Sequence, residues 1–191
     1  MFIQTEPTPN PLTLKFLPGR VVMEEGTAFF QKVSECTASP LAKRLFSIEG
    51  VVGVFFGNDF VTITKEEKLD WQILKPMILG MIMDHYNSGE KAIINSQIDS
   101  KSEDLTLSES KHEDSAVIKQ IKELLDTRVR PAVAMDGGDI VFQGYEKGIV
   151  YLHMQGACSG CPSSTATLKM GIENMLKHYV PEIKEVRPVD I

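Results

Sequence analysis

Two apolar runs in the first half of the chain have the composition of β-strands. Residues 51–56 and 60–65 are rich in valine, isoleucine, threonine and phenylalanine, which favour extended backbone. Three turn-forming residues, Gly57-Asn58-Asp59, separate the two runs. This pattern predicts a β-hairpin.

Apolar residues at helical spacing lie on both sides of this hairpin. A short helix is predicted over 40–48 behind a Ser39-Pro40 start, and a longer one behind Asp70. Since proline lacks the amide proton that a helix interior uses, the regular part of the longer helix is expected to begin near Pro76. We interpret its methionines as core filling, and His85 as a partly buried helix histidine rather than a metal ligand. Its apolar face contains Leu74, Met77, Ile78, Met81, Ile82 and His85.

The second half of the chain predicts a helix, a hairpin, another helix and a last strand, in that order. The first helix is expected to begin at Asp114 or Ser115 and to be stopped by Pro131. Such an order is typical of a small two-layer α+β domain, and the first half fits the same class. The predicted segments are a helix around 117–129, strands at 140–142 and 149–154 joined through 144–148, a helix from Pro162, and a strand at 183–189.

The stretch between the two halves has no hydrophobic period. Residues 88–115 hold seven serines, seven Asp or Glu and three lysines, and they include no aromatic residue. A segment of this kind cannot bury enough apolar surface to order itself. We therefore predict two domains, 1–87 and 115–191, joined by a flexible acidic linker at 88–114, of which 92–94 can still pack on the first domain.

Composition narrows the class of protein. The chain has 191 residues, of which 42% are hydrophobic and 24% charged, as in ordinary globular proteins. Its net charge of −6 argues against nucleic acid as a partner, and three cysteines are too few for a disulfide framework. We see no leader of the secretory or transit type, and the apolar stretch at 73–83 is too short to cross a bilayer. A soluble protein of a reducing compartment, without a membrane partner, is expected.

The strongest chemical signal is the pair Cys158 and Cys161, within Gly156-Ala157-Cys158-Ser159-Gly160-Cys161-Pro162. Two thiols at this spacing can hold a metal or a redox couple. The pair lies between a predicted strand and a predicted helix. This places Cys161 near a helix N-terminus, where exposed amides and the helix dipole stabilise thiolates, so a lowered thiol pKa is expected there.

Other candidate ligands are weaker. Asp136 and Asp139 flank two glycines and could bind a hard cation, but these residues also suit a tight turn, and such a cation needs more oxygen ligands. His153 and His178 could complete a zinc site with the thiols. One lies on a predicted strand and the other more than four helical turns away, so we interpret both as structural or solvent-facing. Cys36 is isolated and is interpreted as a small buried residue.

The number of ligands separates the remaining functions. An iron–sulfur cluster or a closed zinc site takes about four protein ligands, whereas the second domain offers two thiols, so two copies would have to cooperate. Ligands shared between chains can separate, which suits a carrier better than a permanent redox centre. A thiol–disulfide oxidoreductase and a zinc-stabilised interaction module stay open. Against the oxidoreductase, a helix and a hairpin precede the cysteines, where a thioredoxin-like chain has a βαβ start.

The second domain resembles the NifU C-terminal domain, and the first resembles the N-terminal domain that accompanies it in mitochondrial-type Nfu proteins. Together the two resemblances cover nearly everything but the linker. In the second domain the matching segments are 121–126, Arg130-Pro131, Asp136-Gly137-Gly138-Asp139, 156–164 and 168–173. In the first domain they are Thr8-Pro9-Asn10-Pro11, 39–42 and 54–60.

The resemblance implies a non-enzymatic scaffold or carrier for iron–sulfur clusters. It implies that Cys158 and Cys161 of two chains bind one 4Fe-4S cluster in a bridged homodimer. Upstream cluster-assembly proteins would supply this cluster, and apo iron–sulfur proteins would accept it. Cys36 matches no ligand position of the family. The bacterial cytoplasm is the expected location, with the mitochondrial matrix as the alternative.

Overall fold

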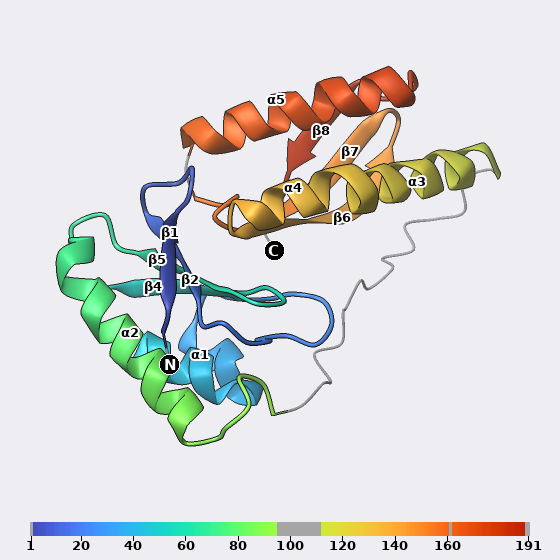
Figure 1. Cartoon of the computed structure of the whole chain (residues 1–191). Coiled ribbons are helices and arrows are strands. Elements are labelled where there is room, and N and C mark those ends of the chain that lie inside the picture. The colour runs from blue at the N-terminus through green and yellow to red at the C-terminus, as the bar shows by residue number, and fades with distance from the viewer. Residues whose placement is uncertain (1, 95–111, 161, 190–191) are drawn as a thin grey trace. The chain divides into compact units, whose positions relative to one another are not determined.

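The computed structural model describes residues 2–94, 112–160 and 162–189. The chain divides into two compact units, Met1–Ser100 and Lys101–Ile191. Each unit has its own sheet and helices, as Figure 1 shows. Each also has its own hydrophobic core. The predicted α+β class is confirmed. Most of the predicted linker lies outside the described residues.

The first unit is an antiparallel five-stranded sheet in the order β1-β2-β5-β4-β3. Val61 and Ile63 of β5 pair with Phe56 and Val54 of β4, so strand register places all four side chains on one face. These four residues share one buried core with apolar residues of both helices. Met77, predicted as core filling, is instead 49% exposed, because it lies on the side of α2 that faces solvent. The elements are β1 (Gln4–Pro7), β2 (Thr13–Leu17), β3 (Ala28–Phe30), the 3₁₀ helix η1 (Val33–Ala38), α1 (Pro40–Phe46), β4 (Val51–Phe56), β5 (Val61–Lys65) and α2 (Trp71–Asn87).

Side-chain caps start both helices of this unit where the sequence predicts them. The Ser39 hydroxyl accepts a hydrogen bond from the amide of Ala42, and the Asp70 carboxylate accepts one from the amide of Gln72. The expected late start near Pro76 is wrong, because α2 is helical from Trp71. Pro76 removes a single bond to the carbonyl four residues earlier, and the Asp70 cap holds the first turn. Among the described residues, no helix is both long and apolar enough to span a bilayer.

The packed part of this unit continues beyond α2. Ala92 is buried, and its carbonyl accepts a hydrogen bond of 2.7 Å from the Ser39 hydroxyl. The amide of Ile94 donates to the carbonyl of Ala38 at 2.9 Å. Residues 92–94 therefore pack on the first unit, as the sequence allowed.

The second unit has a three-stranded sheet in the order β6-β7-β8. β6 and β7 form an antiparallel hairpin, and β8 pairs in parallel with β7 after the crossover through α5. The helical stretch that precedes the hairpin, the helix that follows it and one face of the sheet all contribute residues to a single core. The elements are α3 (His112–Leu124), a π-helical turn η2 (Leu125–Val129), α4 (Arg130–Met135), β6 (Gly138–Glu146), β7 (Ile149–Gly156), α5 (Pro162–Tyr179) and β8 (Glu185–Pro188).

Three predicted boundaries in this unit are wrong. α3 begins at His112, so the expected caps at 114 and 115 lie inside the helix. Pro131 does not stop the helical backbone. It follows the π turn and lies in the first turn of α4, where the amide that proline lacks is not needed for a helical hydrogen bond. The hairpin turn is shorter than predicted, with Lys147 and Gly148 at φ 49° and 88° joining two longer strands.

Candidate metal centre

Cys158 lies on the loop that follows β7 and precedes α5. Figure 1 shows this loop at the end of the second unit where α4 ends and α5 begins. The amide of Ala157 donates to the carbonyl of Gly137 at 3.1 Å, which fastens the loop to the turn before β6. The Thr165 hydroxyl of α5 donates to the carbonyl of Cys158 at 3.2 Å. The cysteine loop is therefore held by the turn before β6 and by α5.

The side chain of Cys158 points into the protein. It is 6% exposed and belongs to the same cluster of buried residues as Val133, Ile140 and Met154. Burial raises its pKa to about 12, and the carboxylates of Asp139 and Asp136 add to the effect. The lowered thiol pKa that the sequence predicts belongs to the thiol beside the helix start, Cys161, and the raised pKa of Cys158 does not test it. Cys161, the other predicted ligand, lies outside the described residues.

The thiol of Cys158 lies against the backbone of Gly138. A Cβ atom added to Gly138 would lie 2.5 Å from Cys158 Sγ, 2.8 Å from the Gln155 carbonyl oxygen and 2.9 Å from the Cys158 amide nitrogen. Gly137, one residue earlier, makes the turn into β6 at φ 82°. The two glycines thus have different tasks. Gly137 permits the turn that the sequence predicts, and Gly138 leaves room for the thiol.

The carboxylate of Asp139 belongs to an ion pair. Its side chain is 4% exposed and accepts hydrogen bonds from Arg130 Nε at 2.9 Å and Arg130 Nη2 at 2.8 Å. The amide of Ile140 donates to the same carboxylate at 2.8 Å. These bonds raise the pKa of Arg130 further above its usual value. Asp139 is therefore a paired structural carboxylate, and the geometry favours the predicted turn over a site for a hard cation.

The remaining candidates lie where the sequence predicted. His153 is buried on β7 with its Nδ1 3.0 Å from the carbonyl oxygen of Val189, and His178 is exposed near the end of α5. Cys36 is buried in the first unit, where burial raises its pKa to about 11. The described residues contain no group of three or more His, Cys, Asp or Glu that could hold a metal ion.

Sequence reasoning missed two residues that shape the loop. Arg130 forms an i,i+4 pair with Asp126, which is a recognisable helix pattern, but its stronger bond to Asp139 joins a helix to a strand. For Gly138 the sequence predicts only a turn. Its contact with the thiol depends on the pairing of Gly138 with Gly156 at the end of the hairpin, which a local pattern does not specify.

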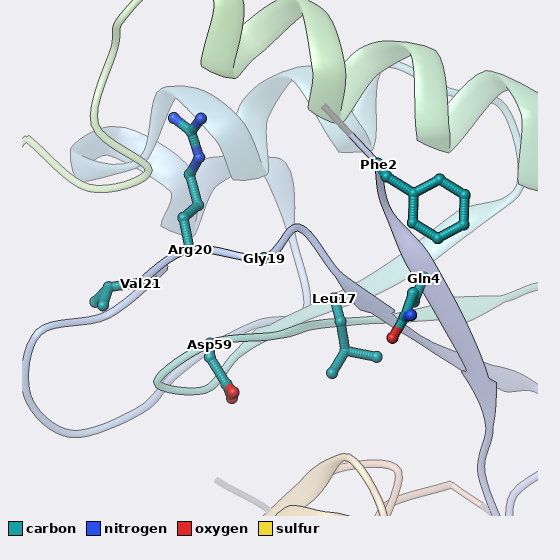
Figure 2. A pocket seen from close by; sticks show the side chains of 7 residues that line it. All are labelled: Phe2, Gln4, Leu17, Gly19, Arg20, Val21 and Asp59. Atoms are coloured by element: carbon teal, nitrogen blue, oxygen red, sulfur yellow. The ribbon is translucent and has the colours of Figure 1, made fainter.

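A hollow in the first unit offers no comparable chemistry. It has a volume of about 550 Å³ and is shown in Figure 2. Its side chains do not converge, since Arg20 extends away from the others and stacks on the ring of Tyr86 at 4.8 Å. The lining residues are Phe2, Gln4, Leu17, Gly19, Arg20, Val21 and Asp59.

Both units match protein-family models. Residues 3–89 match the model described as scaffold protein Nfu/NifU N terminal, and residues 121–187 match the NifU-like domain. These two matches cover most of the described chain and place the cysteine loop inside the NifU-like domain.

Relatives of known name match along nearly the whole chain. NifU-like protein 4, mitochondrial, of Arabidopsis thaliana is 56% identical over 97% of this chain and 65% of its own length. The human NFU1 iron-sulfur cluster scaffold homolog, mitochondrial, is 51% identical over 99% of this chain and 72% of its own length. The chain thus spans about two thirds of the length of these relatives. A solution structure of a NifU-like protein from Saccharomyces cerevisiae is 29% identical, with a TM-score of 0.45 over 49% of this chain and 84% of that one. The chain belongs to the NifU-like family, in the arrangement that has an Nfu/NifU N-terminal domain followed by a NifU-like domain.

Proposed function

We propose that this protein is an iron–sulfur cluster scaffold and carrier. In this proposal Cys158 and Cys161 of two chains bind one 4Fe-4S cluster between them, and the cluster passes to apo iron–sulfur proteins. The observation that carries the proposal is the C-x-x-C loop at the start of α5, within a domain whose relatives include proteins named as iron–sulfur cluster scaffolds.

The chemistry of the loop supports a carrier. Thiolates are the usual protein ligands of iron–sulfur clusters, and a cluster takes about four of them, so two chains with two thiols each complete one set. Transfer then needs only ligand exchange. Each thiolate that leaves iron takes up a proton, and each thiol of the acceptor that replaces it gives one up. No electron has to move, and the protein needs no enzymatic step.

The order of the elements argues against the main alternative. A thioredoxin-like oxidoreductase reaches its C-x-x-C after a βαβ start. In this chain α3, α4 and the β6–β7 hairpin precede the cysteines, and β8 joins the sheet only after α5.

The names of the relatives bear on the location. The Arabidopsis and human relatives are both named as mitochondrial. We therefore favour the mitochondrial matrix over the bacterial cytoplasm. Apo iron–sulfur proteins as acceptors and cluster-assembly proteins as donors follow from the scaffold role.

Cysteine variants test the function. Cys158→Ser, Cys161→Ser and the matched control Cys36→Ser are each reconstituted anaerobically with iron and sulfide. Wild type and Cys36→Ser should develop thiolate-to-iron absorption at roughly 400 nm, and the two loop variants should lose most of it. Full iron and sulfide in both loop variants, or zinc in place of iron in protein purified without added metal, would contradict the proposal.

A further inference from the structure

We propose that Gly138 positions the ligand Cys158 by giving its thiol a buried resting place, and that the thiol leaves this place when it binds iron. The inference rests on the proposed function, because it takes Cys158 as an iron ligand. The buried resting place itself is defined by contacts within the described residues and can be tested without metal.

The resting place exists because residue 138 has no side chain. The thiol of Cys158 occupies the space that a Cβ would need, since the two atoms would lie 2.5 Å apart. The same Cβ would also press on the backbone of Gln155 and Cys158, at 2.8 and 2.9 Å. Backbone atoms cannot move aside as the end of a long side chain can. Any larger residue at 138 must therefore displace the loop together with its thiol.

A cluster cannot reach the thiol in this position. Cys158 is 6% exposed and lies among core residues of its own unit, whereas a bridging cluster has to contact a second chain as well. Ligation therefore requires the side chain to turn outward, with the thiol proton passing to solvent as sulfur binds iron. Glycines with left-handed backbone flank the turn, Gly156 at φ 60° and Gly160 at φ 80°. Such residues absorb a change of backbone conformation at low cost.

The protein's own contacts then compete with iron for the thiol. The hydrogen bond from the Thr165 hydroxyl to the Cys158 carbonyl favours the inward position, as does burial of the thiol itself. When only the open fraction of molecules can bind, apparent affinity falls by that fraction. A thiol that returns to a buried position after it releases iron suits a protein that transfers its cluster to another protein.

Alkylation of the metal-free full chain tests the resting place. Iodoacetamide modification is followed at each cysteine by peptide mass mapping, and the urea-unfolded chain supplies the rate of an accessible thiol. Wild-type Cys158 should react slower than that reference by about two orders of magnitude, as expected for a group exposed only by local opening. Gly138→Ala should remove most of this protection. The matched control is Gly144→Ala on the same strand, where the nearest atom to an added Cβ is 4.0 Å away and the rate should not change.

A second variant keeps the test decisive if Gly138→Ala does not fold. Thr165→Val removes one hydrogen bond to the loop and does not change residue 138. Because one net hydrogen bond is worth about 1 kcal/mol, Cys158 should react about fivefold faster than in wild type. Equal rates in Thr165→Val and wild type, or in Gly138→Ala and Gly144→Ala, would overturn the proposal. Alkylation of native wild-type Cys158 at the unfolded rate would do the same.

The link to ligation has its own measurement. Thr165→Val should take up iron and sulfide faster than wild type under anaerobic conditions, because a larger fraction of its loops is open. An unchanged rate of uptake together with faster alkylation would overturn the claim that the thiol must leave its resting place to bind. A wild-type protein that binds no cluster, with the alkylation pattern intact, would instead contradict the proposed function and leave the resting place standing.

Discussion

Removal of the Arg130 guanidinium should destabilise the second unit strongly. Arg130 supplies two of the three hydrogen bonds described for the Asp139 carboxylate, which is 4% exposed. In Arg130→Met that carboxylate stays buried and loses both hydrogen bonds from the guanidinium, while the bond from the amide of Ile140 remains. Breaking a buried ion pair by removing one partner costs about 3–5 kcal/mol. We take the lower end, about 3 kcal/mol, because Arg130 itself is 38% exposed and water can enter beside it.

Hydrogen exchange measures this loss within the second unit. Amides of β6 and β7 that exchange through global opening of the unit should do so about two orders of magnitude faster in Arg130→Met, since 1.4 kcal/mol is a factor of about ten. The matched control is Asp126→Asn, which removes the other partner of Arg130. Asp126 is 60% exposed, so its loss should cost less than about 1 kcal/mol. Equal effects of the two variants would refute the account of a buried, energetically important pair.

Three further outcomes are expected. Glu173→Gln should cost about 0.5–1 kcal/mol at pH 7, because the carboxylate pairs with Lys177 and accepts from the amide of Val186. These bonds lower the pKa of Glu173 in the folded protein, so the stabilisation is fully present above the ordinary pKa of 4.5 and is lost as pH falls through the lower folded pKa. A difference in the free energy of unfolding between wild type and Glu173→Gln that persists at pH 2 in urea titrations would contradict this assignment. Cys36→Ser should lower the stability of the first unit by about 1 kcal/mol, and a thermal melt unchanged from wild type would show that burial of the thiol contributes nothing. A fragment of residues 112–191 should fold alone, and poorly dispersed amide shifts in its NMR spectrum would show that the second unit depends on the first.

Elements with a strong local signal could be predicted from the sequence. The β4–β5 hairpin follows from its turn residues, and the starts of α1 and α2 follow from the caps at Ser39 and Asp70. Strands β1, β2 and β3 were missed, because they are three to five residues long and their partners lie elsewhere in the chain. β2, for example, pairs with β5 some fifty residues later, a contact that no local pattern indicates.

At the candidate site, too, local features could be predicted from the sequence and tertiary contacts could not. The spacing of Cys158 and Cys161 identifies the loop, and a strand followed by a helix places it correctly. The burial of Cys158, which raises its pKa, and the nearby carboxylate of Asp139, which adds to the effect, depend on tertiary contacts that the β6–β7 pairing brings to the loop. The helix start that predicts a lowered pKa for Cys161 is a local feature. Burial of Cys158 is a tertiary effect, which no local pattern indicates.

Cluster stoichiometry in solution tests the central claim most directly. Sedimentation velocity of the metal-free and reconstituted 191-residue chain, with iron and sulfide measured on the same samples, gives the number of chains for each cluster. By the four-thiolate rule the account predicts about four iron and four sulfide for every two chains in the reconstituted dimer, and loss of the cluster-bound dimer when the cluster is chelated. A monomer that holds a complete cluster on each chain would contradict the account, because Cys158 and Cys161 alone cannot supply four thiolates.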